Sequence, residues 1–176
     1  MRDPEKIEHL RTAVERNIKA IRLRPSIGQG TAVTKVTVRG GCTCDIEDGG
    51  WKLVADDSVK DGGNGEGPDP GVFGRAALGS CVAMGYAMWA AVLGVPLTKI
   101  EVEVQADYDA RGMFGIDDTV TPGWSGMRYA VTIESPAAEA DVMRVLDEAD
   151  RVSPLVDDFR RALTVERQVQ ITAPAR

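Results

Sequence analysis

The sequence predicts an α+β fold in which mostly antiparallel strands pack beside helices. Three observations support this class. The segment 31–38 is rich in β-branched residues, as strands are. The segment 72–93 is apolar at seventeen of its 22 positions, which suits a helix within a core. Residues 100–106 alternate between apolar and polar side chains, which is the pattern of a strand with one buried face.

The overall composition narrows the class of protein. A chain of 176 residues can bury one core, and 43% hydrophobic with 27% charged residues is typical of globular proteins. The net charge of −6 argues against nucleic acid as a partner, because such a surface does not attract phosphate backbones. The N-terminus lacks the apolar core of a secretory signal, so we expect a cytoplasmic protein. Its three cysteines are then expected to be thiols.

The first part of the chain is expected to form a helix and a three-stranded meander. Residues 3–22 have the spacing of an amphipathic helix, with Asp3 as its N-cap and Pro4 in its first turn. Pro25 ends this helix. Three strand-like segments follow: 31–38, 42–47 and 51–55. Their short connections favour antiparallel pairing.

A long loop and an apolar helix occupy the middle of the chain. Residues 56–71 are rich in Asp, Gly and Pro and too long for a tight hairpin. No Lys-Ser/Thr pair follows the glycines, which argues against a phosphate-binding loop. The segment 72–93 is long enough to span a bilayer. Because it lies in mid-chain, carries Arg75 and has acidic flanks, we expect instead a helix buried on all sides in a core, with no membrane partner. Its small residues allow other elements to approach closely: Gly74, Ala77 and Gly85.

Two strands and two helices are expected after the long helix. Residues 100–106 and 127–133 have the composition and alternation of strands. A serine followed by proline then marks the start of each helix, because Ser caps helix N-termini and Pro suits the first turn. The two pairs are Ser135-Pro136, before a helix lined by Val142, Leu146 and Ala149, and Ser153-Pro154, before a short helix through Leu163.

The last segment, 165–171, alternates again and is expected to close the chain as a strand. No internal repeat and no domain linker is evident in the sequence. Residues 1–176 are therefore expected to form one domain.

Cys81, in the long helix, is the candidate for chemistry, and two interpretations of it stay open. A cysteine in an apolar helix is usually an inert packing residue. A reactive cysteine needs a stabilised thiolate, and a helix dipole helps only within the first turn, which Cys81 is past. A cation from elsewhere would have to supply the stabilisation. Arg39 is the candidate, since Arg75 lies about 120° around the helix from Cys81.

The other potential ligands and nucleophiles exclude several kinds of site. His9 is the single histidine and falls in the amphipathic first helix, which argues against Ser-His-Asp triads and histidine-based metal sites. Cys42 and Cys44 are two apart on an expected strand, so their side chains would share a face. With only Cys81 and His9 as further soft ligands, they do not form a known zinc spacing. We expect neither a metal nor a cofactor.

Three motifs in order resemble the OsmC/Ohr-like family, the osmotically induced and organic hydroperoxide resistance proteins. They are the loop GGNGEGPDP at 62–70, the helical ALGSC at 77–81 and VPL at 95–97. The resemblance covers roughly residues 30–173 and leaves residues 1–28 as an N-terminal helical extension. It implies an intertwined homodimer in which each subunit contributes a long sheet, with the central helices packed between.

The resemblance also implies an activity, the reduction of organic hydroperoxides by a cysteine thiolate. Cys81 matches the peroxidatic cysteine of the family. In such a reaction peroxide oxidises the thiolate to a sulfenic acid, and a second cysteine condenses with it. A dithiol reductant then restores the pair by exchange.

The chain departs from the family pattern at three positions. Ser153 stands where the family has its second, resolving cysteine, and about Gly71 the family has a glutamate that orients a catalytic arginine. That arginine follows the Gly-Gly break, where this chain has Cys42. We therefore form the hypothesis that Cys42 replaces the resolving cysteine, facing a Cys81 of its own or the partner subunit. Arg39 and Glu66 are the candidate assisting groups.

The sequence thus predicts an OsmC-like cysteine protein that reduces organic hydroperoxides or senses redox state at Cys81. The alternative is a non-catalytic module on the same fold that binds a small apolar ligand. Met84, Met88 and Trp89 would then line its pocket.

Overall fold

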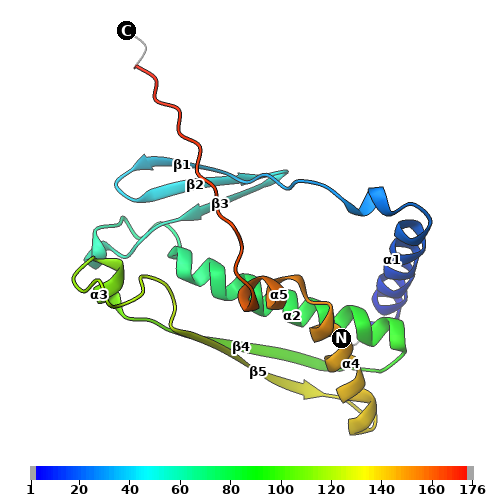
Figure 1. Ribbon diagram of the computed structural model, residues 1–176. Helices are drawn as coiled ribbons and strands as arrows, with labels where there is room; N and C mark the ends of the chain where they lie inside the picture. Colours follow the sequence, from blue (N-terminus) through cyan, green and yellow to red (C-terminus); the bar gives the residue numbers. More distant parts are fainter. Residues whose placement is uncertain (1–2, 174–176) are drawn as a thin grey trace.

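The computed structural model describes residues 3–173 and confirms the α+β class. Figure 1 shows two antiparallel sheets with a long helix running between them. The first sheet has the strand order β1-β2-β3, and the second pairs β4 with β5. The elements that position the candidate site are this long helix, α2, and the two short helices beside it, α4 and α5.

The first helix, α1 (Pro4–Leu23), forms as expected from its capping signal. The side chain of Asp3 accepts hydrogen bonds from the backbone N–H groups of Glu5 and Lys6. The helix packs against α2 but buries none of its own residues. His9 is exposed on it. A short 3₁₀ turn (Pro25–Gly28) follows and leads to the first sheet.

The first sheet is the expected meander of β1 (Lys35–Gly40), β2 (Thr43–Asp48) and β3 (Trp51–Ala55). Residues 31–34 precede the first strand, and Cys42 lies in the turn before β2, so both boundaries differ from the sequence prediction. The pairings Val36↔Ile46 and Ile46↔Leu53 place apolar side chains on one face of the sheet. Much of that face is exposed in the chain described.

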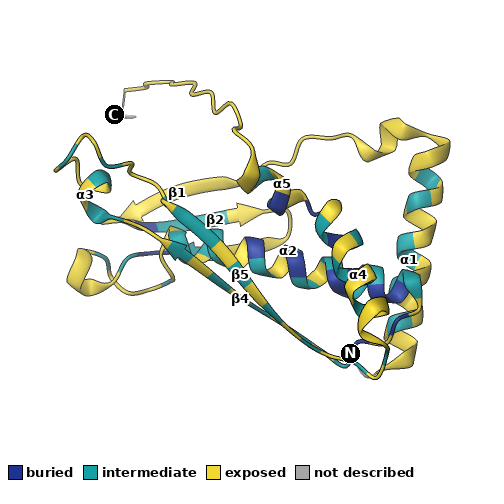
Figure 2. Ribbon diagram, turned by 60° about the horizontal axis from the view of Figure 1, so that its bottom comes forward, coloured by how far each residue is buried: buried dark blue, intermediate teal, exposed yellow. Residues whose placement is uncertain are grey.

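The central helix, α2 (Pro70–Leu93), begins and ends on strong signals. Asp69 accepts hydrogen bonds from the N–H groups of Gly71 and Val72, and Gly94 ends the helix in the left-handed region with φ of 69°. By length and composition α2 could cross a membrane, as the core helices of soluble proteins also could. The expectation of burial on all sides is wrong for this chain, because Met84 is 63% exposed. One face of α2 is covered by other elements and another is open (Figure 2).

The covered face of α2 packs on the second sheet and on α4. Strands β4 (Lys99–Asp107) and β5 (Gly126–Glu134) pair along their whole length, and the short helix α3 (Ala110–Met113) lies in their connection. Helices α4 (Glu139–Arg151) and α5 (Pro154–Arg160) complete the core. The buried residues of the main cluster come from α2, α4 and α5: Leu78, Val82, Tyr86, Ala149 and Val156. Figure 2 shows these elements carrying most of the buried positions.

Two predictions about the last two helices are wrong. Ser135 does not cap α4, which begins at Glu139. Instead its hydroxyl donates to the carbonyl of Pro96 at 2.6 Å and accepts from the N–H of Ala137. The short helix α5 ends at Arg160 rather than at Leu163.

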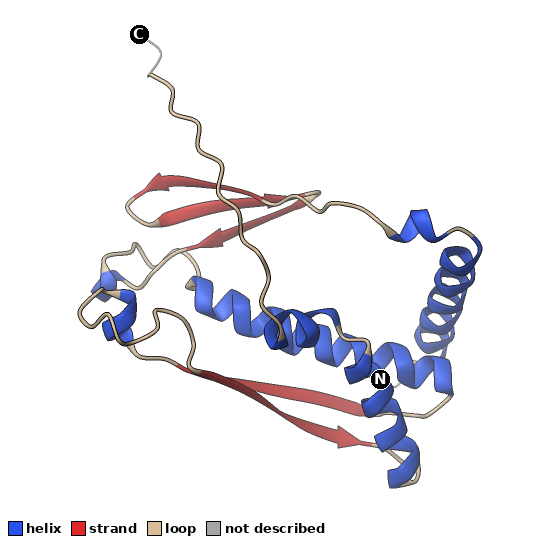
Figure 3. Cartoon of the chain, in the orientation of Figure 1, coloured by secondary structure: helices blue, strands red, loops and turns tan. Residues whose placement is uncertain are grey.

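The segment 165–171 is not a strand in the structure. It continues from α5 as an extended loop, drawn in tan in Figure 3, and Val165 and Ile171 are each 92% exposed. An alternating sequence can form a strand only where a sheet edge offers hydrogen-bond partners. In the described chain neither sheet includes these residues as a strand.

Candidate functional site

Cys81 lies at an apolar cleft between α2 and the turn that joins α4 to α5. The cleft has a volume of about 540 Å³. Helix α2 contributes Cys81, Met84, Met88 and Trp89 to its lining. The other wall comes from Val152 and Ser153 of the turn and from the first residues of α5, Pro154 and Leu155. Cys81 is half-buried, so its sulfur is held by the fold and still faces the cleft.

Ser153 is the polar side chain nearest to the thiol. Its Oγ lies 3.6 Å from the Sγ of Cys81, within hydrogen-bonding distance for sulfur, and the residue is only 7% exposed. Ser153 is the N-cap of α5, as the sequence predicted, but its hydroxyl makes no capping hydrogen bond. The hydroxyl is therefore directed at Cys81 rather than at the helix end.

The backbone around Ser153 holds this hydroxyl in place. The N–H of Ser153 donates to the carbonyl of Asp150, and its own carbonyl accepts from the N–H of Asp157 at 3.1 Å. Pro154 fixes the first turn of α5. The position of the Ser153 side chain is thus set on both sides by the turn from α4 to α5.

Asp150 anchors the same turn to the core. It accepts a hydrogen bond from the hydroxyl of Tyr86 at 2.9 Å and one from the hydroxyl of Tyr129 at 3.0 Å. We call these three residues the tyrosine–aspartate clamp, which joins α2, α4 and β5. Burial, and then the Asp150 carboxylate, raise the pKa of Tyr86 and of Tyr129 above the ordinary value. Both tyrosines therefore stay protonated as donors.

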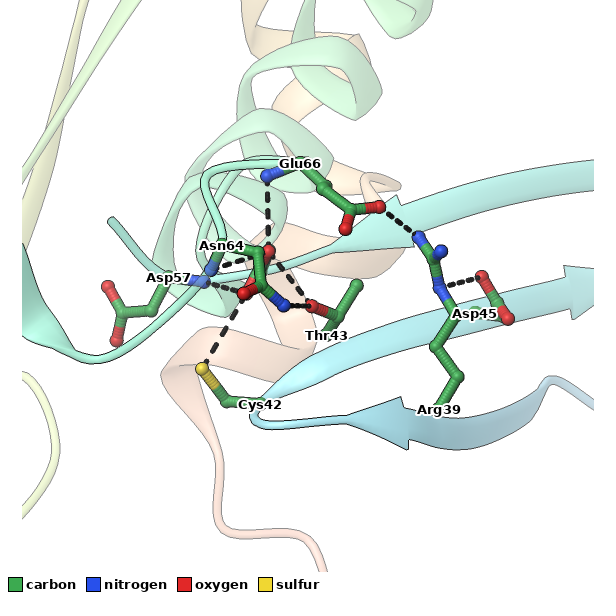
Figure 4. Close-up of polar contacts among 8 residues, drawn as sticks. Arg39, Cys42, Thr43, Asp45, Asp57, Asn64 and Glu66 are labelled. Carbon is green, nitrogen blue, oxygen red and sulfur yellow. Dashed lines mark hydrogen bonds and ion pairs between the residues drawn. The ribbon is translucent and has the colours of Figure 1, made fainter. Parts of the chain in front are cut away.

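A second polar cluster surrounds Asp56, at the end of the first sheet (Figure 4). Asp56 is 2% exposed. It accepts hydrogen bonds from the N–H groups of Asp57, Asn64 and Glu66 and from the hydroxyl of Thr43. Burial alone would raise the pKa of this carboxyl, but these donors outweigh it and hold the pKa at about 2. The charged carboxylate thereby organises the glycine-rich loop before α2.

Arg39, Cys42 and Glu66 all lie at this Asp56 cluster rather than at the Cys81 cleft. Arg39 forms an ion pair with Glu66 and another with Asp45 at 3.2 Å, as Figure 4 shows. Its charge is thus already balanced by two carboxylates of its own chain. Glu66, the other candidate assisting group, is paired with Arg39 at this cluster.

The prediction that Cys42 and Cys44 lie on the same strand is wrong. Cys42 lies in the turn and its thiol donates to Oδ1 of Asp56 at 3.6 Å, whereas Cys44 lies in β2 and donates to the carbonyl of Cys42 at 3.4 Å. The turn breaks the two-residue period on which the prediction depended. Neither residue is among those that line the Cys81 cleft.

The three departures from the family pattern have local explanations. A Cβ atom at Gly71 would lie 2.8 Å from Oδ1 of Asp69, the oxygen that caps α2, so a larger residue there would disturb the cap. Ser153 occupies the position facing Cys81. Cys42 is engaged by Asp56.

Several residues of these clusters were not identified from the sequence. Asp56 has one local signal, since an acidic residue directly before a glycine-rich loop suits a loop-organising acceptor. The tyrosine–aspartate clamp has none, because its members are far apart along the chain. Within residues 3–173, no group of three or more His, Cys, Asp or Glu side chains is placed to hold a metal ion.

Comparison with known proteins adds family information to this geometry. Residues 63–167 match the family model described as OsmC-like protein. The fold is similar to an OsmC-like protein from Mycoplasma pneumoniae, with a TM-score of 0.64 and 13% identity over 75% of this chain and 89% of that one. It is also similar to an organic hydroperoxide resistance protein OsmC from Legionella pneumophila, with a TM-score of 0.53 and 17% identity over 74% and 90% of the two chains.

A further similar structure is an OsmC-like hydroperoxide resistance protein from Jannaschia sp. CCS1. Its TM-score is 0.50, with 17% identity over 78% of this chain and 90% of that one. A search of curated protein sequences found no match. At these identities the solved structures establish the fold.

Proposed function

Because the chain belongs to the OsmC-like protein family, we propose that it reduces organic hydroperoxides with the thiol of Cys81. One observation carries the proposal: Cys81 is half-buried at an apolar cleft, with a hydroxyl 3.6 Å from its sulfur. The cleft suits the apolar part of a hydroperoxide, and its mouth leaves the sulfur accessible. Two solved relatives described as hydroperoxide resistance proteins share the fold.

The reaction follows from thiolate chemistry. The Cys81 thiolate attacks the terminal oxygen of the hydroperoxide, and the O–O bond breaks as the S–O bond forms. The sulfur becomes a sulfenic acid, and the alkoxide leaves as an alcohol after taking a proton. A thiol reductant returns Cys81 to the thiol by exchange, so turnover suits a reducing compartment such as the cytoplasm.

The test is stopped-flow consumption of cumene hydroperoxide by the wild-type protein and by Cys81→Ser. We expect consumption to be lost in Cys81→Ser, because serine lacks the nucleophilic thiolate. Cys44→Ser is the matched control and should retain activity, since Cys44 is bonded to a backbone carbonyl away from the cleft. Equal, slow consumption by wild type and Cys81→Ser would refute the proposed reaction.

The lining of the cleft also favours a second function, in which the protein binds a small apolar ligand without catalysis. Met84, Met88 and Trp89 give the cleft an adaptable apolar wall. Titration calorimetry of Cys81→Ser with a medium-chain fatty acid separates the two functions. Binding without peroxide consumption by wild type would support the module, and no binding would exclude it.

We also propose that the protein works as a homodimer. The apolar face of the first sheet carries Val36, Val38 and Leu53, all exposed in the single chain. The open face of α2 and the apolar side chains of residues 165–171 are exposed as well. So many exposed apolar side chains are unusual on a monomer, and a second copy of the chain would cover them. Arg39 and Glu66 could then assist Cys81 only from the partner subunit or by rearrangement.

A further inference from the structure

We propose that Ser153 stabilises the Cys81 thiolate by a hydrogen bond, and that the resulting sulfenic acid is reduced directly by an external thiol. The second half of this proposal depends on the function proposed above, whereas the first half concerns only the two side chains. It differs from the hypothesis that Cys42 is the resolving cysteine.

The first step in the argument is the direction of the hydrogen bond. Ser153 is 7% exposed, and its hydroxyl has no capping role and lies 3.6 Å from the Cys81 sulfur. A thiolate carries no proton and can only accept, so in that state the serine hydroxyl must be the donor. Hydrogen bonds to a charged acceptor are stronger than those between neutral groups.

The second step is the lack of any other charge-stabilising group in the cleft. Its lining residues, all within the described chain, come from α2, the end of α4 and the turn before α5, and none of them carries a charged side chain. Asp150, the acidic residue nearest to Ser153 along the chain, already accepts hydrogen bonds from Tyr86 and Tyr129. Arg39 is paired at the other cluster. Within one subunit, the Ser153 hydroxyl is therefore the group placed to stabilise the thiolate.

The third step is the absence of a thiol partner at the cleft. Among the described residues that line it, Cys81 is the only cysteine. The thiols of Cys42 and Cys44 are bonded to Asp56 and to a backbone carbonyl in the other cluster. A serine at the facing position cannot form a disulfide with Cys81. The sulfenic acid would then persist until an external thiol reduces it.

The chemistry balances with a thiol as the named co-reactant. An external thiolate attacks the sulfenic sulfur, an S–S bond forms, and the oxygen leaves as water after protonation. A second external thiol attacks this mixed disulfide and releases the Cys81 thiol together with an oxidised disulfide of the reductant. Two external thiols are thus oxidised for each hydroperoxide reduced.

The hydrogen bond is tested without peroxide, by alkylation of Cys81 with iodoacetamide followed by peptide mass spectrometry. In Ser153→Ala we expect the alkylation rate at pH 7 to fall about tenfold and the pH profile to move to higher pH, because the donor to the thiolate is lost. Ser125→Ala is the matched control. Ser125 does not line the cleft, and its hydroxyl donates to the carbonyl of Asp107, so the rate should not change. An unchanged rate in Ser153→Ala would overturn the assignment.

The route of reduction is tested with one equivalent of cumene hydroperoxide. In the wild-type protein we expect a dimedone-trapped sulfenic acid at Cys81 and, after addition of glutathione, a mixed disulfide there. In Ser153→Cys we expect instead a disulfide between positions 81 and 153. A linked peptide joining Cys81 to Cys42 or Cys44 in the wild type would refute external reduction. If Cys81 is never oxidised, the proposed peroxidase function fails, and the alkylation experiment still decides the role of Ser153.

Discussion

At the residue scale, the carboxylate of Asp150 in α4 connects its helix to α2 and to β5 by hydrogen bonds. Each of its carboxylate oxygens accepts one tyrosine hydroxyl, Tyr86 from α2 and Tyr129 from β5. Because Asp150 lies three residues before Ser153, the clamp also fixes the wall of the cleft that faces Cys81. The position of the Ser153 hydroxyl thus depends on a hydrogen-bond network outside the cleft.

Replacing Tyr86 with Phe tests the clamp. The ring keeps its packing while the hydrogen bond to Asp150 is lost, so we expect the free energy of unfolding at pH 7 to fall by about 1–3 kcal/mol. Urea denaturation measures the change. Tyr108→Phe is the control, because Tyr108 is exposed in a loop. Equal stabilities of wild type and Tyr86→Phe would show that the hydrogen bond contributes nothing.

The raised pKa of Tyr86 also predicts how the stability of the protein changes at alkaline pH. The pKa of Tyr86 is raised by burial and then by Asp150, so its folded state holds the proton more tightly than the unfolded chain, whose tyrosine pKa is near 10.0. This stability is present below pH 10 and is lost as pH rises above it. The loss between pH 10 and 11 should be smaller in Tyr86→Phe than in the wild type. A loss of the same size in both proteins would be inconsistent with this linkage.

At the scale of elements, the loop before α2 depends on the charge of Asp56. Its carboxyl has a pKa of about 2, against an ordinary value of 3.8, so the unfolded chain binds this proton at higher pH than the folded protein does. The contribution to stability is complete above about pH 4 to 5 and is lost as pH falls through 2. Acid should therefore loosen the loop that positions the start of α2.

Asp56→Asn tests this acid dependence. An amide cannot accept from all the N–H groups that converge on the carboxylate, so we expect lower stability at pH 7 and a flatter loss of stability between pH 5 and 2. Thermal melts across this pH range provide the measurement. The exposed Asp118→Asn serves as the control and should keep the wild-type pH dependence. A wild-type slope in Asp56→Asn would contradict the assignment.

Two glycines of α2 predict opposite outcomes for the same substitution. A Cβ at Gly74 would lie 2.6 Å from Cη2 of Trp124, whereas one at Gly85 would meet the Cβ of Ala149 at an ordinary 3.7 Å. Gly74→Ala should lower the free energy of unfolding by about 1–3 kcal/mol through overpacking. Gly85→Ala should raise it by up to about 1 kcal/mol, because alanine favours the helix. Urea denaturation of both proteins distinguishes these effects, and a stabilised Gly74→Ala would show that Trp124 moves freely.

At the scale of the whole molecule, the exposed apolar surface predicts the assembly. We expect wild-type protein to sediment at about twice its 18.9 kDa chain mass. Val38→Asp, on the apolar face of the first sheet where Val38 is 61% exposed, should shift it toward the monomer. Thr37→Asp lies on the opposite face and is the control. A wild-type monomer would contradict the proposed dimer, and circular dichroism would show whether each variant folds.

The sequence by itself determined the features that depend on neighbouring residues. The cap at Asp3 and the three-stranded meander both follow from local patterns, and the structure contains them. The order of motifs also identified the family and placed Cys81 on the central helix. Short-range rules suffice here because each signal acts within about one helical turn or one strand pair.

Only the tertiary structure decided which distant side chains meet. A serine before a proline indicates a helix cap, yet the hydroxyl of Ser153 faces Cys81, 72 positions earlier in the chain. Asp56 and Asp150 became hydrogen-bond centres because the fold delivers their donors from other elements. Residues 165–171 alternate like a strand but belong to neither sheet in the chain described. Local preference sets what a segment can form, and the partners that burial brings to it determine what it does form.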